Sequence, residues 1–340
     1  MKKSKNTTII ISVIALIIFA TSFAFAENKI TVGISLPTQR EERWVKDAEY
    51  LQAEAKKLGM DVKLQISDND AIKQVSQCEN LLAQNINVLI IAPHDAEGAA
   101  AIVEKAHKAG IKVISYDRLI KNCDADLYIS FDNVKVGELQ GKYITDMVPK
   151  GNYIVLSGSP TDNNATLFKE GAMKFIKPKA DTGEIKIVME QAVKDWQPIE
   201  AMKIVENALM ANDNKIDAVL APNDGTAGGV IQALAAQKLD GKVPVTGQDS
   251  ELSGAQRIVE GSQAMTVFKD TRKLAISAIN AAAKIAANSA PETNGKVNNG
   301  KIDVPSMLLT PIAVDKNNID KELIDSGYLK KEDVYKNVKK

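Results

Sequence analysis

The stretch KVISYDRLI, from Lys112 to Ile120, has the pattern of a buried β-strand that ends in two opposite charges. Val113 and Ile114 are the branched, apolar residues of a strand that is covered on both faces. Asp117 and Arg118 follow at its carboxyl end, and the apolar pattern then returns at once. A surface ion pair does not need to lie at the carboxyl end of a buried strand. If other strands end in polar residues in the same way, the pair indicates a ligand-binding site.

Similar apolar strands alternate with helical patterns through the first half of the chain. The expected strands are ITVGISL (Ile30–Leu36), DVKLQIS (Asp61–Ser67), VLIIAP (Val88–Pro93), KVISYD and YISFDN (Tyr128–Asn133). Helical stretches are expected at Glu41–Leu58 and then up to about Gln84, Ala109 and Met147. Short strands that alternate with helices predict βαβ units and a parallel sheet.

The same alternation begins again after residue 150. The expected strands are YIVLSGS (Tyr153–Ser159), IKIVMEQ (Ile185–Gln191), AVLAPND (Ala218–Asp224) and VPVTGQD (Val243–Asp249). MTVFKD (Met265–Asp270) and MLLTPIAV (Met307–Val314) are each expected as single strands, with an Asn/Gly-rich loop at Asn294–Gly300 between them. Isolated late strands suit segments that cross between lobes. The sequence therefore predicts an α/β protein with two doubly wound parallel-sheet lobes.

Composition limits the classes of function. The chain has 340 residues, 45% hydrophobic and 25% charged, with a formal net charge of zero. This neutrality argues against a general nucleic-acid binder, which carries a basic face. The length suits two domains.

The N-terminus is expected to be an export segment rather than part of the fold. Lys2, Lys3 and Lys5 precede an apolar run, Thr7–Ala26, that ends in the small-x-small sequence Ala24-Phe25-Ala26. A cleaved signal peptide and an uncleaved membrane anchor both fit, because the run is close to the ~20 residues that span a bilayer. Either interpretation places the rest of the chain in the periplasm or on the outer face of the cytoplasmic membrane.

Polar side chains recur at the strand ends, where open α/β sheets bind ligands. Asn223-Asp224, Gln248-Asp249 and Lys269-Asp270 end later strands, and the only two tryptophans, Trp44 and Trp196, stand near such ends. Amides, carboxylates and cations match the adjacent hydroxyls of a sugar, and an aromatic ring can cover its C–H face. Singly, these residues have simpler interpretations, such as a helix N-cap for Asp224 or core packing for Trp44.

Other chemistries have weak support. The two histidines, His94 and His107, have no second histidine or cysteine at metal-ligand spacing, so no metal is expected. Neither a dinucleotide fingerprint nor a P-loop is present, so no cofactor is expected. The two cysteines could form one disulfide, although Cys78 lies in a helical pattern typical of a core residue. An enzyme would need a metal or a working carboxylate pair. Asp117 and Asp249 have basic or amide neighbours instead, so no enzyme is expected.

In order along the chain, the motifs resemble the periplasmic sugar-binding proteins of the ribose/galactose type, and within them the D-xylose-binding group that serves sugar ABC transporters. The matching motifs run from about Lys29 to the C-terminus and include ERWVKD, SYDRLI, YISFDNVKVGELQ, GSPTDNNA, NKIDAVLAPND, IQALAAQ, GQD and LLTPI. The resemblance implies a type I periplasmic binding protein fold with three crossing segments and a cleft that closes on one monosaccharide. The expected lobes are residues 28–135 with 275–307 and residues 136–274 with 308–340.

The resemblance also implies a set of ligand-binding positions. They are Arg43, Trp44, Asp117, Arg118, Asn164, Lys169, Trp196, Asn223, Asp249 and Lys269. At Lys169 the family often has arginine, so a point charge replaces a planar fork there.

The sequence leaves open the biological role of the protein and its partner. Sugar-responsive repressors share this fold but carry an N-terminal helix-turn-helix, and an apolar segment stands in its place here. The implied partner of a binding protein is an ABC transporter permease. The alternative is a membrane-anchored D-xylose sensor that signals to a histidine kinase, since Thr7–Ala26 is long enough to span a membrane.

Overall fold

The computed structural model describes residues 29–338. The apolar run Thr7–Ala26, expected to be a signal peptide or an anchor, lies outside the described residues. Across residues 29–338, no helix has both the length and the apolar character needed to cross a bilayer.

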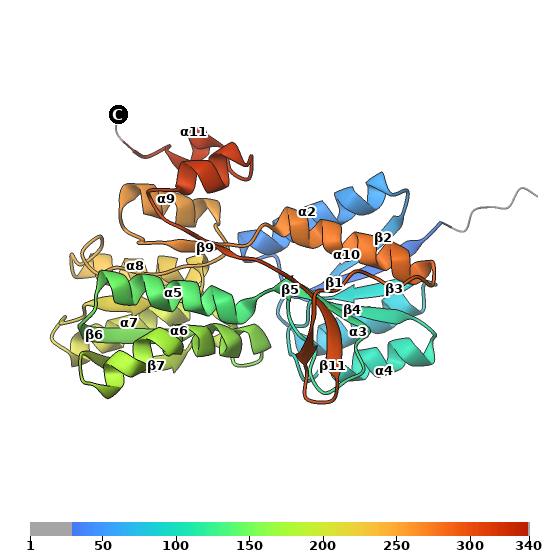
Figure 1. Ribbon diagram of the computed structural model, residues 1–340, viewed down its shortest axis with the longest axis horizontal. Helices are drawn as coiled ribbons and strands as arrows, with labels where there is room; N and C mark the ends of the chain where they lie inside the picture. Colours follow the sequence, from blue (N-terminus) through green and yellow to red (C-terminus); the bar gives the residue numbers. More distant parts are fainter. Residues whose placement is uncertain (1–28, 339–340) are drawn as a thin grey trace, which may run out of the picture.

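The first lobe is built on a seven-stranded sheet in the order β10-β11-β5-β4-β3-β1-β2, parallel except at β10 (Figure 1). Its strands are β1 (Thr31–Leu36), β2 (Asp61–Ile66), β3 (Val88–Ile91), β4 (Lys112–Tyr116), β5 (Leu127–Phe131), β10 (Gly295–Asn298) and β11 (Asp303–Leu309). Its helices are α2 (Glu42–Lys57), α3 (Ala71–Leu82), α4 (Ala100–Lys108) and α10 (Thr271–Ala286).

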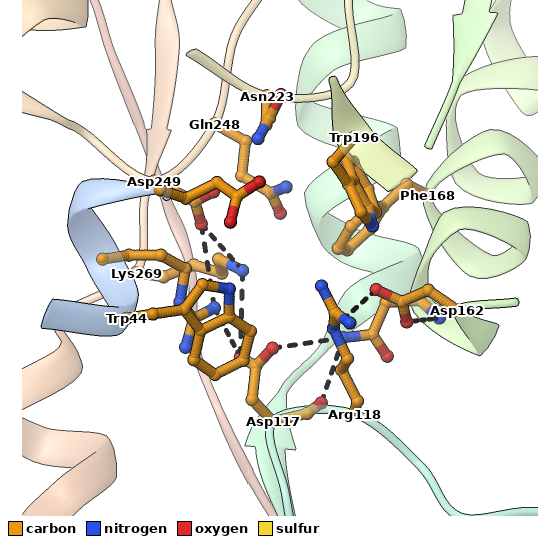
Figure 2. A pocket seen from close by; sticks show the side chains of 13 residues that line it. Trp44, Asp117, Arg118, Asp162, Phe168, Trp196, Asn223, Gln248, Asp249 and Lys269 are labelled. Carbon is orange, nitrogen blue, oxygen red and sulfur yellow. Dashed lines mark hydrogen bonds and ion pairs between the residues drawn. The ribbon is translucent and has the colours of Figure 1, made fainter. Parts of the chain in front are cut away.

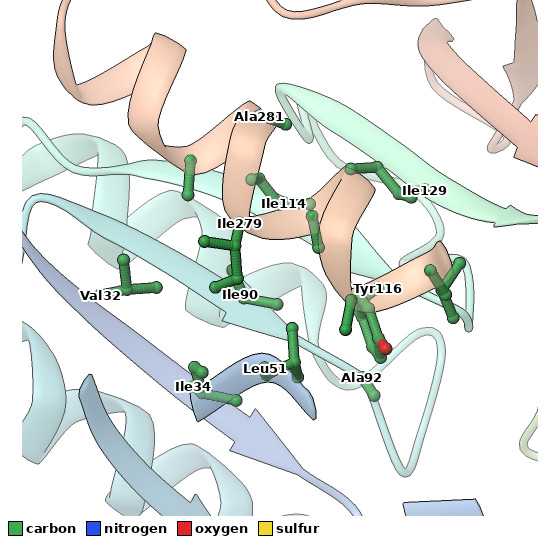
Figure 3. Close-up of a cluster of buried hydrophobic side chains, with 14 of the residues drawn as sticks. Val32, Ile34, Leu51, Ile90, Ala92, Ile114, Tyr116, Ile129, Ile279 and Ala281 are labelled. Carbon is green, nitrogen blue, oxygen red and sulfur yellow. The ribbon is translucent and has the colours of Figure 1, made fainter. Parts of the chain in front are cut away.

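Continuous apolar strands allow helices to cover both faces of this sheet. In β3, Val88 and Ile90 pack with α2 and α10, while Leu89 and Ile91 pack with α3 and α4 on the other face. Figure 3 shows the first of these layers, with Ile279 of α10 above the strands. Because successive side chains point to opposite faces, an unbroken apolar run predicts this two-sided burial.

The second lobe repeats the arrangement with shorter strands. Its strands are β6 (Gly151–Ser157), β7 (Ile185–Ala192), β8 (Ala218–Leu220), β9 (Thr266–Phe268) and β12 (Ile312–Val314). Its helices and helical turns are α5 (Asn133–Met147), α6 (Asn163–Asp181), η1 (Lys194–Trp196), α7 (Pro198–Ala211), α8 (Asp224–Ala236), α9 (Leu252–Glu260), η2 (Asp320–Asp325) and α11 (Lys331–Val334). The order β7-β6-β8 corresponds to β2-β1-β3 of the first lobe.

Three strand predictions need correction. Residues 243–249 form only an isolated bridge, Val219 to Val245, although their backbone also bonds to β9 on the other side. The run Met307–Val314 is two strands, β11 and β12, in different sheets, because the chain crosses between lobes at Thr310 and Pro311. The predicted loop Asn294–Gly300 contains the edge strand β10, whose exposed side chains give no apolar signal.

The chain changes lobe three times, as the fold prediction requires. The crossings lie between β5 and α5, between β9 and α10, and between β11 and β12. The prediction of two doubly wound lobes joined by three crossing segments is therefore confirmed.

The two cysteines do not form a disulfide. Cys78 and Cys123 are both buried and free, and both pack in the core layer beneath α3 and α4. Burial raises the pKa of the Cys78 thiol to about 11. Cys78 is therefore a small core residue, which was one of the two alternatives that the sequence left open.

Candidate functional site

A small pocket lies between the two lobes and is lined by residues of both. Most of the lining residues belong to strand ends or to the first turns that follow them (Figure 2). They are Glu41, Arg43, Trp44, Asp117, Arg118, Asp162, Asn164, Phe168, Trp196, Asn223, Gln248, Asp249 and Lys269. All the predicted ligand positions except Lys169 are among them.

Arg43 is held rigidly by two buried carboxylates. Its Nε and Nη2 atoms donate to Oδ2 of Asp47 at 3.0 and 2.7 Å, and its Nη1 donates to Oδ2 of Asp117 at 2.8 Å. Burial alone would lower the pKa of Arg43, but Asp117, Asp47 and Asp249 outweigh burial and raise it well above its usual value. The guanidinium therefore stays charged and in one place.

Asp117, at the end of β4, is held in place by backbone hydrogen bonds and by a partner from helix α2. Its backbone is left-handed, with φ of 57°, and its carbonyl oxygen accepts from Tyr128, Ser130 and Asn164. Burial alone would raise the pKa of Asp117, but Arg43 and Lys269 outweigh it and lower the pKa. Asp117 and Arg118 therefore do not pair with each other. Asp117 pairs with Arg43, and Arg118 pairs with Asp162 of the other lobe at 2.8 Å.

The second lobe contributes an acid and an aromatic wall. Asp249 lies 2.9 Å from Nζ of Lys269 and has a left-handed backbone, with φ of 92°. Trp196 is also left-handed, with φ of 57°, and meets Phe168 edge-on at 6.3 Å. Gly158 leaves room for the indole, since a Cβ there would come within 2.0 Å of the ring. Strained backbone at such residues is typical of functional sites.

The two tryptophans come from opposite lobes. Trp44 is buried beneath two guanidinium groups, with Cζ of Arg43 at 4.2 Å and Cζ of Arg118 at 5.1 Å from its ring centre. Trp196 lines the cavity from the second lobe. The cavity therefore has an aromatic surface on each lobe, as the sequence predicts for a sugar ring.

Four buried polar atoms on these lining residues have no hydrogen-bond partner among residues 29–338. They are Oε2 of Glu41, Nε1 of Trp196, Oε1 of Gln248 and Oδ1 of Asp249. The last has ionic contacts with Nζ of Lys269 at 2.9 Å and Nη1 of Arg43 at 3.9 Å, without a directed hydrogen bond. Three of the four atoms are acceptors and one is a donor. Because buried polar groups are nearly always satisfied, this set indicates that a polar ligand completes the site.

The prediction for Lys169 needs correction. Its Nζ atom forms an ion pair with Glu190 outside the cavity, and Lys169 is not among the lining residues. Phe168, the preceding residue on α6, lines the cavity instead. On a helix, Phe168 and Asn164 share a face because they are four residues apart, whereas Lys169 is turned about 100° away.

Four lining residues were not predicted. Gln248 has a visible signal, since it precedes Asp249 at a strand end. Asp162 resembles an ordinary N-cap, and its carboxylate does accept from the backbone N–H of Asn164. Phe168 follows from the helix phase of Asn164. Glu41 has no signal of its own in the sequence.

The contacts across the mouth of the cavity show that the lobes are closed. Thr161 of the second lobe donates to the carbonyl of His94 at 3.1 Å and accepts from the N–H of Ala96 at 3.0 Å. Arg40 donates to the backbone oxygen of Asp195. Within residues 29–338, no group of three or more His, Cys, Asp or Glu side chains is arranged to hold a metal ion.

Comparisons with known proteins agree with this geometry. A family model described as a periplasmic binding protein domain matches residues 32–290. The D-xylose-binding periplasmic protein of Haemophilus influenzae is 48% identical over 94% of this chain and 96% of its own length. Its Escherichia coli counterpart is 47% identical over 92% of this chain and 95% of its own length.

A solved structure of a related protein has the same fold as this chain. It is a carbohydrate transporter solute binding protein from Chloroflexus aurantiacus in complex with D-glucose. Its TM-score to this chain is 0.84 at 38% identity, and the match covers 90% of this chain and 98% of that chain.

Proposed function

The chain belongs to the periplasmic binding protein family, and we propose that it binds one molecule of D-xylose by closing its two lobes over the sugar. The observation that carries this proposal is the set of unpartnered buried atoms at the cavity, on Glu41, Trp196, Gln248 and Asp249. A sugar hydroxyl donates one hydrogen bond and accepts others, so adjacent hydroxyls suit a site that offers both acceptors and a donor.

The charges of the site favour a neutral ligand. Arg43 is paired with Asp47 and Asp117, Arg118 with Asp162, and Lys269 with Asp249. A phosphorylated or acidic sugar would need a cation that is free to pair with it. The cations of this cavity already have carboxylate partners. A neutral monosaccharide therefore fits better than a sugar acid or a sugar phosphate.

Size and relatives favour a monosaccharide, and D-xylose in particular. The pocket is small and is walled by side chains of both lobes, which leaves little room for a second sugar ring. The relatives with nearly half of their residues in common are named for D-xylose, while the structural neighbour described above holds D-glucose. Micromolar binding needs about −8 kcal/mol. A pentose has about ten heavy atoms, so this binding free energy is well within the limit of about −1.5 kcal/mol per heavy atom for small ligands.

The site is built for binding and not for catalysis. A sugar hydrolase would need one carboxyl group held protonated beside one that is ionised. The pKa of Asp117 is lowered because Arg43 and Lys269 outweigh burial, so this group stays ionised. Asp249 lies against the ammonium of Lys269. Burial raises the pKa of the lining carboxyl of Asp162, but Arg118 and the N–H of Asn164 hold this group in place. These acids thus have fixed partners within the protein, and we assign the protein no enzymatic activity.

The closed form is the species that a membrane partner recognises. For an extracytoplasmic sugar-binding protein, this partner is the permease of an ABC transporter. A sensor role, with a histidine kinase as partner, is favoured by one observation, the apolar run Thr7–Ala26. In either case the sugar shifts the population toward the closed shape that the partner binds better.

A fluorescence titration tests the sugar. Trp44 and Trp196 are the only tryptophans of the chain, and both line the cavity, so selectively excited tryptophan fluorescence reports on this site. Saturable quenching or enhancement is expected with D-xylose at micromolar concentration. Ribose, arabinose and glucose should give weaker responses. A response to another of these sugars and none to D-xylose would overturn the assignment.

Mass spectrometry of the native N-terminus separates the two partners. A mature chain that begins at Glu27 would support a released binding protein that serves a permease. An intact N-terminus in the membrane fraction would support the anchored sensor, and crosslinking with and without D-xylose would then identify its partner.

A further inference from the structure

Two helices that meet across the boundary between the lobes have no side-chain cap from their own N-cap residue. The helices α3, α5, α6, α8 and α10 are each capped by the side chain of their own N-cap residue, an Asp or an Asn. Helix α2 of the first lobe begins after Glu41, and helix α9 of the second lobe begins after Glu251. Neither glutamate caps its own helix. The first N–H groups of these helices therefore need another acceptor.

Each of these helices is capped by a glutamate from the other lobe. The carboxylate of Glu42, at the start of α2, accepts from the N–H of Leu252 at 2.8 Å. The carboxyl group of Glu251, at the start of α9, accepts from the N–H of Glu42 at 3.2 Å. Burial, followed by the nearby charges of Asp224, Asp249 and Glu42, raises the pKa of Glu251 well above its usual value, so Glu251 accepts this bond as a neutral carboxyl group. The two bonds form a reciprocal pair that exists only while the lobes are together.

The supporting contacts hold both glutamates in place. The second carboxylate oxygen of Glu42 pairs with Lys46 at 2.6 Å, one turn further along α2. The backbone N–H of Glu251 donates to Oδ2 of the buried Asp224 at 3.0 Å. Both glutamates also lie beside cavity residues in the sequence. Glu42 precedes Arg43 and Trp44, and Glu251 follows Asp249 by two residues.

We propose that Glu42 and Glu251 are positioning residues that latch the closed cleft by capping each other's helices across the lobe boundary. Neither is among the residues that line the cavity, so each acts through closure and not through contact with the sugar. The latch fixes the start of α2 against the segment that carries Asp249. This inference rests on the proposed function, because it concerns how a bound sugar is retained.

The latch sets the population of the closed form. The apparent affinity for a ligand that is bound in the closed form falls with the fraction of protein able to close. Loss of an N-cap weakens a helix terminus enough to change an equilibrium about 3- to 30-fold. Here the caps exist only in the closed form, so that change falls on sugar affinity. Because opening releases the sugar, the change should appear mainly in the dissociation rate.

The experiment compares the variants Glu42→Ala and Glu251→Ala with Glu42→Gln and Glu251→Gln in D-xylose binding by calorimetry and stopped-flow fluorescence. Each alanine variant is expected to bind about 3- to 30-fold more weakly, with faster release of the sugar. The glutamine variants keep an acceptor oxygen and should recover most of the affinity. Asp70→Ala is the matched control, because it removes the cap of α3 within the first lobe, away from the cavity.

The outcomes separate this inference from the proposed function. If the wild type binds none of the sugars tested, the proposed function fails. If the wild type binds D-xylose and both alanine variants bind and release it as the wild type does, the latch is wrong. If Asp70→Ala weakens binding as much as Glu42→Ala does, the effect is general destabilisation and the latch is again wrong.

Discussion

The two walls of the cavity differ in how their polar groups are satisfied. On the first-lobe wall, Arg43 and Asp117 are tied into an ion-pair network with the buried Asp47. On the second-lobe wall, Trp196, Gln248 and Asp249 each present a buried atom with no hydrogen-bond partner in the described chain. On the first wall only Oε2 of Glu41 lacks a hydrogen-bond partner among residues 29–338, whereas the second wall has three such atoms.

The difference separates residues that build the site from residues that bind at it. A buried ion pair that loses one partner leaves an uncompensated charge in the folded protein, so a change on the first wall should act on folding. A buried atom that has no hydrogen-bond partner in the sugar-free protein contributes little to folding, so removing it should act mainly on binding. Asp249 should affect both properties, because it also pairs with Lys269. The following predictions test this division, from the largest expected effect to the smallest.

Arg43→Met should cause the largest loss of stability. Asp47 and Asp117 would lose their shared partner, and the free energy of unfolding of the sugar-free protein should fall by about 3–5 kcal/mol. Urea unfolding followed by circular dichroism measures this. Lys169→Met is the matched control, since its ion pair with Glu190 is partly exposed and should matter by less than about 1 kcal/mol. If Arg43→Met were as stable as the wild type, the proposed difference between the two walls of the cavity would be wrong.

Asp249→Ala should cause the largest loss of binding. The sugar would lose an acceptor, and Lys269 would be left without its close carboxylate partner, so affinity should fall by about 2–5 kcal/mol. Calorimetry with D-xylose measures the change, and Lys169→Ala should leave affinity unchanged because Lys169 lies outside the cavity. If Asp249→Ala unfolded as readily as Arg43→Met and yet bound the sugar normally, the two walls would not differ as described.

Trp196→Phe isolates one of the unpartnered atoms. The change removes the Nε1 donor and keeps an aromatic ring beside Phe168, so affinity should fall by about 0.5–1.5 kcal/mol. The free energy of unfolding of the sugar-free protein should fall only by the packing that the smaller ring gives up, about 1–2 kcal/mol, because Nε1 has no partner to lose. An affinity equal to that of the wild type would show that the sugar does not bind this donor.

The smallest effect is expected at the rim. Burial, followed by the charge of Arg118, lowers the pKa of His94, which lies 4.0 Å from Asp195 of the other lobe. Asp195, Asp95 and Asp162 oppose that shift. A histidine whose pKa is lower in the folded than in the unfolded protein contributes its full stability above the unfolded pKa of about 6.5. That contribution is lost as the pH falls below about 6.5 toward the folded pKa. His94→Gln should therefore unfold with less dependence on pH between about 7 and 5 than the wild type. A steeper dependence in the variant would contradict this sign.

Strands with strong apolar runs could be predicted from the sequence, and weak or split ones could not. The strands β1, β3, β4 and β5 have mostly apolar residues because both of their faces are buried, whereas the edge strand β2 alternates and is only partly buried. The edge strand β10 is held by backbone pairing with β11 and has exposed side chains, so no pattern marks it. The division of Met307–Val314 between two sheets depends on where the lobes sit, which local periodicity does not contain.

The site could be predicted where it follows from chain direction and not where it follows from rotation or closure. Parallel strands bring their carboxyl ends to one edge, which unites Asp117, Asn223 and Asp249. Lys169 was misplaced by one helical position, because a matching motif does not fix which face of α6 looks inward. The caps of Glu42 and Glu251 join residues far apart in the sequence and exist only between closed lobes.

The most direct test is a calorimetric titration with D-xylose and with D-xylonate, which has the same carbon chain but carries a carboxylate. The second wall offers mainly acceptors, and the cations of the cavity are already paired. We predict one molecule of D-xylose bound per chain with micromolar affinity, and no measurable heat with D-xylonate. Binding of D-xylonate with equal or higher affinity, or no binding of D-xylose, would contradict the account.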